Sequence, residues 1–334
     1  MKAIPGTARG SLAGTTCVPR PRPAPALVLA LTAAAVVAGV ACGREPSPVK
    51  STPAPVPIAA GCGITLALLP ERNVFEQKKR YQPLQEYLST AIGRPVSFKL
   101  LDNYQLIFTE ILERRVEGAF FGSMNGAIAQ LKGGVEILAR PVELSGVSTY
   151  TGVIFTKIDS GVTEDPRTWR GKRVALVNKV TTAGYLYPLS LLRLSGYQGE
   201  PESYFKQLIF TGSHDAAILA VFNGEADFGA CKNTVFDEFT RLHPEIQRGL
   251  SVLAVSAEVP SNGLGVRPDL DPELKRRLRE ALIAMNSRED GQRALRQFQA
   301  QRFEETSARD YEPVLKMASQ AGVDLAAWPL REIH

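Results

Sequence analysis

The sequence predicts an α/β fold, in which short strands alternate with helices, and three observations support this prediction. From residue 64 onward, short apolar runs alternate with segments in which apolar residues recur at helical spacing. Two segments, 110–125 and 217–232, repeat one order of features: a helical pattern, then glycine, alanine, an aromatic residue and glycine. A third segment joins the apolar run 174–177 to a helical pattern at 186–194 through two threonines. Because alternating strands and helices usually form βαβ units, we expect mostly parallel strands.

The elements follow in order from these patterns. A strand at 64–69 ends at a proline, and a helix at 80–92 ends at a glycine and a proline. A strand at 96–101 alternates apolar and polar residues, and Asp102-Asn103 can cap the helix that follows. Further strands are expected at 118–121, 135–141, 151–157, 173–177 and 208–212. Helices are expected at 272–286, 291–299 and 309–321.

The two repeated segments indicate a cleft. Each would place polar residues just after the carboxyl end of a strand, which is where open α/β sheets bind ligands. We therefore expect two lobes that face one cleft. Ordinary glycine-rich turns are the alternative.

Residues 1–41 are expected to be an export signal. A basic stretch precedes the uncharged run 26–41, which is shorter than the roughly 20 residues that a membrane-spanning helix needs. The next residue is Cys42, and Gly39-Val40-Ala41-Cys42 resembles a bacterial lipobox, although Gly39 replaces the usual larger aliphatic residue. We expect lipidation at Cys42; a soluble secreted form or an uncleaved anchor are the alternatives. The proline-rich segment 42–62 then reads as a tether.

Charge and cysteine content exclude two classes of site. The formal net charge is +5, but four basic residues lie within the predicted signal, so the remainder is nearly neutral and does not favour nucleic-acid binding. Outside the signal and Cys42, only Cys62 and Cys231 remain. A disulfide between them is permitted after export, yet two free thiols are the simpler expectation. The three histidines show no zinc spacing, and no metal or cofactor is expected.

The clearest candidate site is the segment Thr181-Thr182-Ala183. A helix start offers unpaired N–H groups and a positive dipole end, and the two threonines add hydroxyl donors, so this turn can hold an anion. It lacks the lysine and glycine pattern of a nucleotide loop. His214 begins another helix after the strand at 208–212 and is expected at the same edge, with Asp215 capping the helix or setting the histidine tautomer. A simple threonine cap and a structural histidine are the alternatives. No hydrolase motif occurs, so the chemistry indicated is binding.

The sequence resembles the periplasmic phosphate/phosphite/phosphonate-binding proteins of ABC transporters. The resemblance covers residues 63–324. It rests on YQPLQEYLSTAIGRPV, GAFFGSMNGAIA, WRGKRVALV, TTAGYLYP, GSHDAAILAVFNGEADFGA and RPDLDPELKRRLREAL. It implies the two-lobed type II periplasmic-binding-protein fold with a ligand cleft between the lobes. One lobe would comprise 63–150 and 256–330, and the other 151–255.

The resemblance also implies which residues bind the ligand. In that family the turn equivalent to Thr181-Thr182-Ala183 wraps the phosphonate oxygens, although Ala183 lacks the family's third hydroxyl. The matching histidine, His214, contacts the anion, and a tyrosine that we assign to Tyr104 closes over it. At four cleft positions this sequence differs from the family's usual residues: Ser123, Met124, Asn125 and Lys232. Of these, we expect Ser123, Asn125 and Lys232 to contact the ligand.

The implied function is that of a monomeric, extracytoplasmic lipoprotein without enzymatic activity. It would bind a small tetrahedral oxyanion by lobe closure and present it to a membrane permease, which is a separate chain. A sensing module for a membrane kinase is one alternative. An enzyme is another, because relatives of this fold make a pyrimidine precursor, and it would use Cys231 and His214. Glu71 or Asp102 would either meet an amine on an aminophosphonate or simply be solvated.

Overall fold

The first of two large sheets contains strands from both ends of the folded chain. The computed structural model describes residues 63–331, so the predicted signal, Cys42, the tether and Cys62 lie outside the described residues. The six strands run in the order β13-β4-β12-β3-β1-β2. They are β1 (Ile64–Leu68), β2 (Val96–Leu100), β3 (Gly118–Phe121), β4 (Glu136–Glu143), β12 (Gly263–Val266) and β13 (Ala300–Glu305). The late strand β12 therefore separates β3 from β4.

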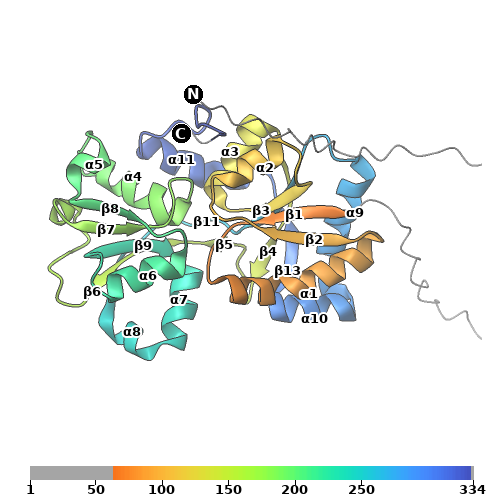
Figure 1. Cartoon of the computed structure of the whole chain (residues 1–334), viewed down its shortest axis with the longest axis horizontal. Coiled ribbons are helices and arrows are strands. Elements are labelled where there is room, and N and C mark those ends of the chain that lie inside the picture. The colour runs from red at the N-terminus through yellow and green to blue at the C-terminus, as the bar shows by residue number, and fades with distance from the viewer. Residues whose placement is uncertain (1–62, 332–334) are drawn as a thin grey trace, which may run out of the picture. The chain divides into compact units, whose positions relative to one another are not determined.

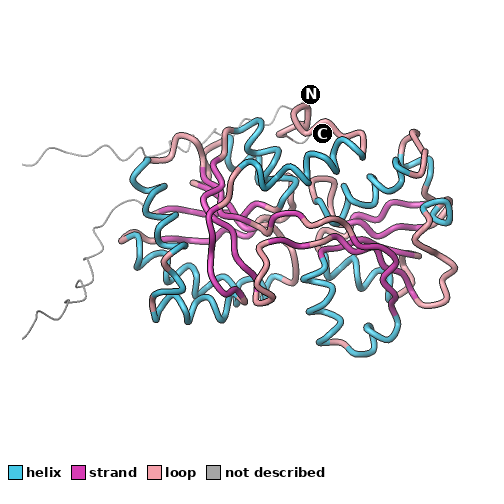
Figure 2. The backbone as a smooth tube through the Cα atoms, turned by 180° about the vertical axis from the view of Figure 1, so that it is seen from behind, coloured by secondary structure: helices cyan, strands magenta, loops and turns pink. Residues whose placement is uncertain are grey.

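The second sheet has five strands in the order β10-β6-β9-β7-β8. They are β6 (Gly152–Lys157), β7 (Arg173–Leu176), β8 (Gln207–Phe210), β9 (Phe228–Lys232) and β10 (Leu250–Val255). A short antiparallel pair, β5 (Thr149–Tyr150) and β11 (Val259–Pro260), lies between the two sheets (Figure 1, Figure 2). We call β5 and β11 the crossing strands, and each large sheet with its helices a lobe, numbered in chain order.

Four of the six strands in the first sheet and four of the five in the second share one direction, as expected, but antiparallel strands lie between them. β1 is parallel to β2 and β3, and β7 is parallel to β8 and β9. In contrast, β12 and β13 in the first sheet and β6 and β10 in the second pair antiparallel with their neighbours. Local alternation of strand and helix predicts only the parallel units. The direction of strands that follow a crossing or the C-terminal return is set by long-range topology.

Helices cover both faces of each sheet (Figure 1). On the first sheet these are α1 (Val74–Ile92), α9 (Pro272–Ile283) and α10 (Glu289–Phe298) on one face, and α2 (Leu106–Leu112) and α3 (Ser123–Gly133) on the other. On the second sheet they are the π-helical turn η2 (Thr182–Leu186), α4 (Tyr187–Leu194) and α5 (Pro201–Tyr204), and opposite them α6 (His214–Phe222), α7 (Asn233–Leu242) and α8 (Pro244–Gly249). Single 3₁₀ turns are η1 (Pro166–Trp169), η3 (Met285–Ser287) and η4 (Ala308–Tyr311). The last helix, α11 (Glu312–Gln320), packs against both α3 and α4.

Helix α1 begins at Val74, six positions before the predicted residue 80. The side chain of Asn73 accepts a hydrogen bond of 2.9 Å from the N–H of Phe75, which caps the helix. The helix ends as predicted at Gly93, whose φ of 65° suits glycine. A cap residue within a polar stretch thus extends a helix beyond its apolar periodicity.

The apolar core has two parts. One lies between the first sheet and helices α1, α9 and α10, and includes Leu84, Leu278 and Phe298. The other runs continuously from the first lobe to the second through the crossing strand residue Tyr150 and through Val314 of α11. The two lobes therefore share a core behind the cleft. None of the helices in the described region is long and apolar enough to cross a membrane.

Candidate functional site

The predicted site residues meet around one small cavity between the lobes. Its volume is about 10 Å³, which is room for about one water molecule, so the lobes are closed. The lining residues are Leu69, Glu71, Tyr104, Gly122, Ser123, Asn125, Tyr150, Thr181, Thr182, Ala183, His214 and Asn262. Every predicted ligand contact lines this cavity except Lys232, which lies beside it. Entry of a ligand requires the lobes to open.

The turn at Thr181 has the conformation that an anion site needs. The first backbone bond of the following helix runs from the N–H of Leu186 to the carbonyl of Thr181, at 3.1 Å. Because a helix leaves its first N–H groups without intrahelical acceptors, those of Thr182 and Ala183 remain available at the cavity. Gly184 is required here: a Cβ at this position would lie 2.5 Å from the Cβ of Val177.

Thr181 occupies the N-cap position, but neither threonine side chain caps the helix. The hydroxyl of Thr181 donates backwards to the carbonyl of Asn178, at 2.6 Å. The hydroxyl oxygen of Thr182 accepts a hydrogen bond of 2.8 Å from the N–H of Met124 in the first lobe. Neither side chain bonds its own helix start. Thr182 thus joins the lobes directly at the cavity.

Three helix N-termini converge on the cavity. The lining residue Ser123 begins α3, Thr182 begins the η2–α4 helix, and His214 begins α6. Each N-terminus carries the positive end of a helix dipole, worth roughly half a unit charge. Their convergence favours an anion without any lysine or arginine at the centre.

His214 is held as a neutral donor. Its Nδ1 accepts a hydrogen bond of 3.1 Å from the backbone N–H of Lys232, so the proton of the neutral ring is on Nε2. Burial lowers the pKa of His214, Glu71 partly opposes this and Lys232 adds to it, and the resulting pKa is about 4. Asp215 does not set the tautomer, because its carboxylate accepts from the N–H groups of Asn73 and Ala216 instead.

Two polar atoms of the first lobe have no partner in the closed cavity. Within residues 63–331, the hydroxyl of Tyr104 and the Oδ1 of Asn125 are buried without a hydrogen bond. The Tyr104 ring lies edge-on to His214, with ring centroids 6.5 Å apart. Buried polar atoms are almost always paired, so these two indicate the places where a bound ligand completes the site.

The side chain of Ser123 is hydrogen-bonded to the crossing strands. Its Oγ lies 2.7 Å from the carbonyl of Pro260 and 3.0 Å from the hydroxyl of Tyr150, one residue from each crossing strand. This side chain therefore fixes the start of α3 against the crossing strands. Its contribution to the cavity is mainly that of a positioning residue.

Three important lining residues were missed or understated by sequence reasoning. Glu71 was expected only as a contact for an amine or as a solvated residue, and Tyr150 and Asn262 were not singled out. Burial raises the pKa of Glu71, but nearby positive charges, above all that of Lys232, outweigh this and lower it to about 2. The other acid considered, Asp102, is exposed. Glu71 carried the same signal as the predicted residues, since it follows the carboxyl end of a strand.

Lys232 links these three residues. Its Nζ lies 3.7 Å from Glu71 Oε1 and 3.2 Å from Asn262 Oδ1. The same ammonium lies 4.4 Å from the centre of the Tyr150 ring. Since Lys232 ends β9 in the second lobe and Glu71 follows β1 in the first, this cation bridges the closed cleft.

Further bonds close the rim of the cleft. The guanidinium of Arg72 contacts Glu238 of α7 at 2.6 Å, and the N–H of Asn73 donates to Asp215 at 2.7 Å. The N–H of His214 donates to the carbonyl of Glu71 at 3.0 Å. We call these three contacts the rim clasp. All three contacts join the two lobes, and none of them places a charged group at the centre of the cavity.

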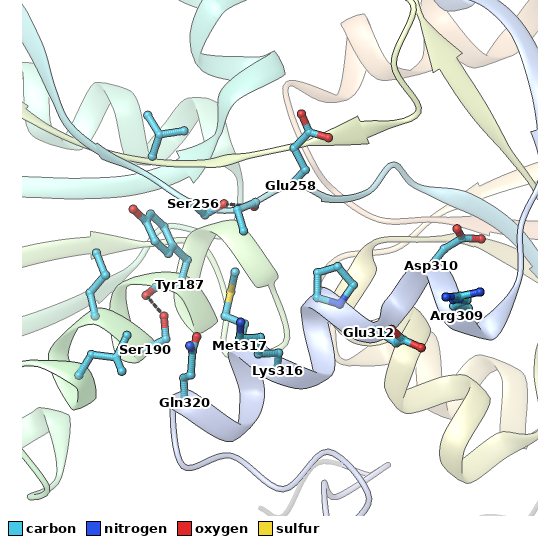
Figure 3. A pocket seen from close by; sticks show the side chains of 15 residues that line it. Tyr187, Ser190, Ser256, Glu258, Arg309, Asp310, Glu312, Lys316, Met317 and Gln320 are labelled. Carbon is cyan, nitrogen blue, oxygen red and sulfur yellow. Dashed lines mark hydrogen bonds between the residues drawn. The ribbon is translucent and has the colours of Figure 1, made fainter.

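A much wider groove, of about 1000 Å³, lies elsewhere, between α4, the segment after β10 and α11 (Figure 3). It contains none of the predicted site residues. Ser190, one of its polar side chains, bonds locally to the carbonyl of Tyr187 at 2.7 Å, and none of the buried atoms without a partner in residues 63–331 belongs to its lining. The small cavity, with its unpaired buried atoms, is therefore the better candidate site.

Neither Cys231 nor a metal ion contributes to the site formed by the described residues. Cys231 is a buried free thiol, and burial raises its pKa well above the usual range, which makes it a weak nucleophile. It does not line the cavity. Among the described residues, no group of histidine, cysteine and carboxylate side chains is arranged to hold a metal ion.

Comparison with known proteins agrees with this geometry. The family model described as "ABC transporter, phosphonate, periplasmic substrate-binding protein" matches residues 66–311. The chain belongs to this family. The resemblance seen in the sequence is confirmed, and the sensor alternative is not favoured.

Curated relatives and solved structures extend the comparison. The phosphate-import protein PhnD of Mycolicibacterium smegmatis is 29% identical over 182 residues, which cover 52% of this chain and 56% of that protein. The probable phosphite-binding protein PhnD1 of Prochlorococcus marinus is 21% identical over 80% of this chain and 90% of its own length.

Two solved structures show the same fold. One is that of Prochlorococcus marinus PhnD1 in complex with methylphosphonate, with a TM-score of 0.69 at 19% identity over 78% of this chain and 98% of that chain. The other is a binding-protein component of an ABC phosphonate transporter from Pseudomonas aeruginosa, with a TM-score of 0.71 at 20% identity, covering 78% and 86%. The two-lobed α/β fold predicted from the sequence is confirmed.

Proposed function

We propose that this protein captures a small tetrahedral phosphorus oxyanion, of the phosphate, phosphite or phosphonate type, and delivers it to a membrane permease. The main support is the convergence of three helix N-termini on one closed cavity that also holds a neutral histidine donor. The names of the relatives, which import phosphate or bind phosphite, agree with this ligand class. Binding would proceed without chemical conversion of the ligand.

Within this proposal, the ligand contacts are Thr181, Thr182, Ala183, His214, Tyr104, Asn125 and Lys232, while Ser123, also predicted as a contact, lines the cavity mainly as a positioning residue. The lobes are residues 63–150 with 256–330, and residues 151–255. They would close about the crossing strands, by a hinge motion of the kind that binding proteins use. The protein would act as a monomer outside the cytoplasmic membrane, anchored by lipid on Cys42.

The proposal is tested by calorimetric titration of ligand-free protein with phosphate, phosphite and methylphosphonate. Charge-assisted hydrogen bonds are worth about 1.5–3 kcal/mol each. The double variant Thr182→Ala/His214→Ala should therefore weaken binding at least about 100-fold while its far-ultraviolet circular dichroism is unchanged. A parent protein that binds none of the three anions, or a double variant that binds as well as the parent, would disprove the proposed site.

The membrane anchor needs its own test. Wild-type protein should label with radioactive palmitate and fractionate with membranes. Cys42→Ser should be unlabelled. Equal labelling of both would disprove lipidation at Cys42.

A further inference from the structure

Glu71 lines the cavity, and its carboxylate has no hydrogen-bond donor among residues 63–331. Its side chain is 14% exposed. Within residues 63–331, no donor lies within hydrogen-bonding distance of its carboxylate oxygens, and Lys232 Nζ remains at 3.7 Å. The backbone holds it in place, since its N–H donates to the carbonyl of Leu69 and its own carbonyl accepts from His214.

Two shielded carboxylates away from the cavity are fully paired, whereas Glu143, which does not line the cavity, has only Arg80 at 4.0 Å. Glu110 accepts from Lys99 at 2.6 Å and from Arg115 at 2.9 Å. Asp227 accepts from the backbone and the guanidinium of Arg173, both at 2.7 Å. Glu71 is thus an ionised acceptor that lacks a hydrogen-bond donor and lines the cavity. A shielded carboxylate that lacks hydrogen bonds is costly even with a cation at 3.7 Å, so a donor on the ligand would stabilise the closed state.

The fixed charges of the cavity do not favour a highly charged ligand. The negative charge of Glu71 and the positive charge of Lys232 oppose each other, and His214 is neutral. Attraction of an anion therefore comes from neutral donors and helix dipoles. A fully ionised oxyanion, such as sulfate, would place a bare oxygen against the Glu71 carboxylate with no hydrogen to share.

The donor on the ligand is a hydroxyl rather than an ammonium group. The cationic position beside Glu71 is already taken by Lys232, and a ligand ammonium there would face a like charge. A hydroxyl on the tetrahedral centre adds no charge and can donate to a carboxylate. We therefore expect a hydroxyl, and not an amine, at Glu71.

We infer that Glu71 accepts a hydrogen bond from a protonated oxygen of the ligand, which makes the site selective for P–OH anions over sulfate and aminoalkylphosphonates. The inference rests on the proposed function, since it concerns the same cavity. It names Glu71 as a specificity-determining residue, with Lys232 as the group that excludes a ligand amine.

The experiment is a calorimetric titration of ligand-free protein with phosphate, methylphosphonate, aminomethylphosphonate and sulfate. Wild type should bind phosphate or methylphosphonate at least about 100-fold more tightly than sulfate. Glu71→Gln should narrow this ratio at least about tenfold, because an amide can donate to a sulfate oxygen. Glu71→Asp, which keeps the acceptor, should still reject sulfate. Asp102→Asn removes an exposed carboxylate of the same lobe and serves as the matched control, with an unchanged ratio.

The outcomes separate the two proposals. If wild type binds none of the phosphorus anions, the proposed function itself fails. If wild type binds them but also binds sulfate within tenfold, or if Glu71→Gln leaves the ratio within twofold, only the role of Glu71 is overturned. Should Glu71→Gln not fold, the wild-type ratio and Glu71→Asp still decide: loss of sulfate rejection in either contradicts the inference. Binding of aminomethylphosphonate as tight as that of methylphosphonate contradicts the role of Lys232.

Discussion

The ion pair between Arg72 and Glu238 should control how long a ligand stays bound, although neither residue lines the cavity. The pair joins the lobes at 2.6 Å, and its side chains are only 14% and 25% exposed. Glu238 also accepts from Gln299 of the first lobe at 3.2 Å. A hydrogen bond to a charged group is worth about 1.5–3 kcal/mol, and partial exposure places this one near the lower end, at about 1.5 kcal/mol.

Glu238→Gln keeps the shape of the side chain and removes its charge. A loss of about 1.5 kcal/mol from the closed state lowers the closing constant roughly tenfold, and affinity falls with the population of the closed form. We expect the dissociation rate of phosphate or methylphosphonate, measured by stopped-flow mixing, to rise about tenfold with little change in association rate. Small-angle X-ray scattering should show a larger radius of gyration in the ligand-free variant.

The matched control is Glu273→Gln. Glu273 pairs with Arg276 and Arg277 on the surface of α9, where the side chains are about half exposed. Exposed pairs contribute little, so affinity and dissociation rate should be unchanged. If Glu238→Gln behaves like this control, with both constants within twofold of wild type, the rim clasp does not hold the lobes closed.

Two further predictions concern the cavity. Tyr104→Phe should weaken anion binding about tenfold or more without lowering the stability of the ligand-free protein, because its hydroxyl has no partner there. Tyr87→Phe should lower stability and leave anion binding unchanged, since its hydroxyl donates to the carbonyl of Ala281 at 2.8 Å. Calorimetric titration and urea unfolding of both variants measure the two effects. Equal effects of both variants would contradict this. Burial lowers the pKa of His214 from 6.5 to about 4. As the pH falls from 6.5 to 4, the unfolded chain binds a proton at this residue before the folded protein does, so the free energy of unfolding should decrease by roughly 3 kcal/mol. The free energy of unfolding of His214→Gln should not show this decrease. If the variant and the wild type lose the same stability over this pH range, His214 is not the group responsible.

Local chemistry explains what the sequence could predict. The Thr181 turn, His214 and the start of α3 follow the carboxyl ends of strands, and each signal is contained within a few residues. The same short-range reasoning located most strands and the C-terminal helices. It failed for the start of α1, where Asn73 caps a polar first turn.

The rest depends on contacts between distant segments. Tyr150 and Asn262 reach the cavity only because the crossing strands bring the chain back between the lobes. The tautomer of His214 is set by the backbone of Lys232, a group that has no sequence signature. The open acceptor on Glu71 appears only once its surroundings are assembled, because the sequence cannot show which carboxylates remain without donors.

The position of β12 has a consequence for the order in which the chain can fold. Synthesis and translocation both proceed from the N-terminus, yet β4 cannot be joined to β3 until Gly263–Val266 has emerged to pair with both. Early segments of the first lobe therefore lack the strand that completes their sheet, and long-range pairing of this kind is slow. For an exported chain this delay would be an advantage. A lobe whose sheet is incomplete stays unfolded, and can pass through a translocation channel, until most of its sequence has crossed.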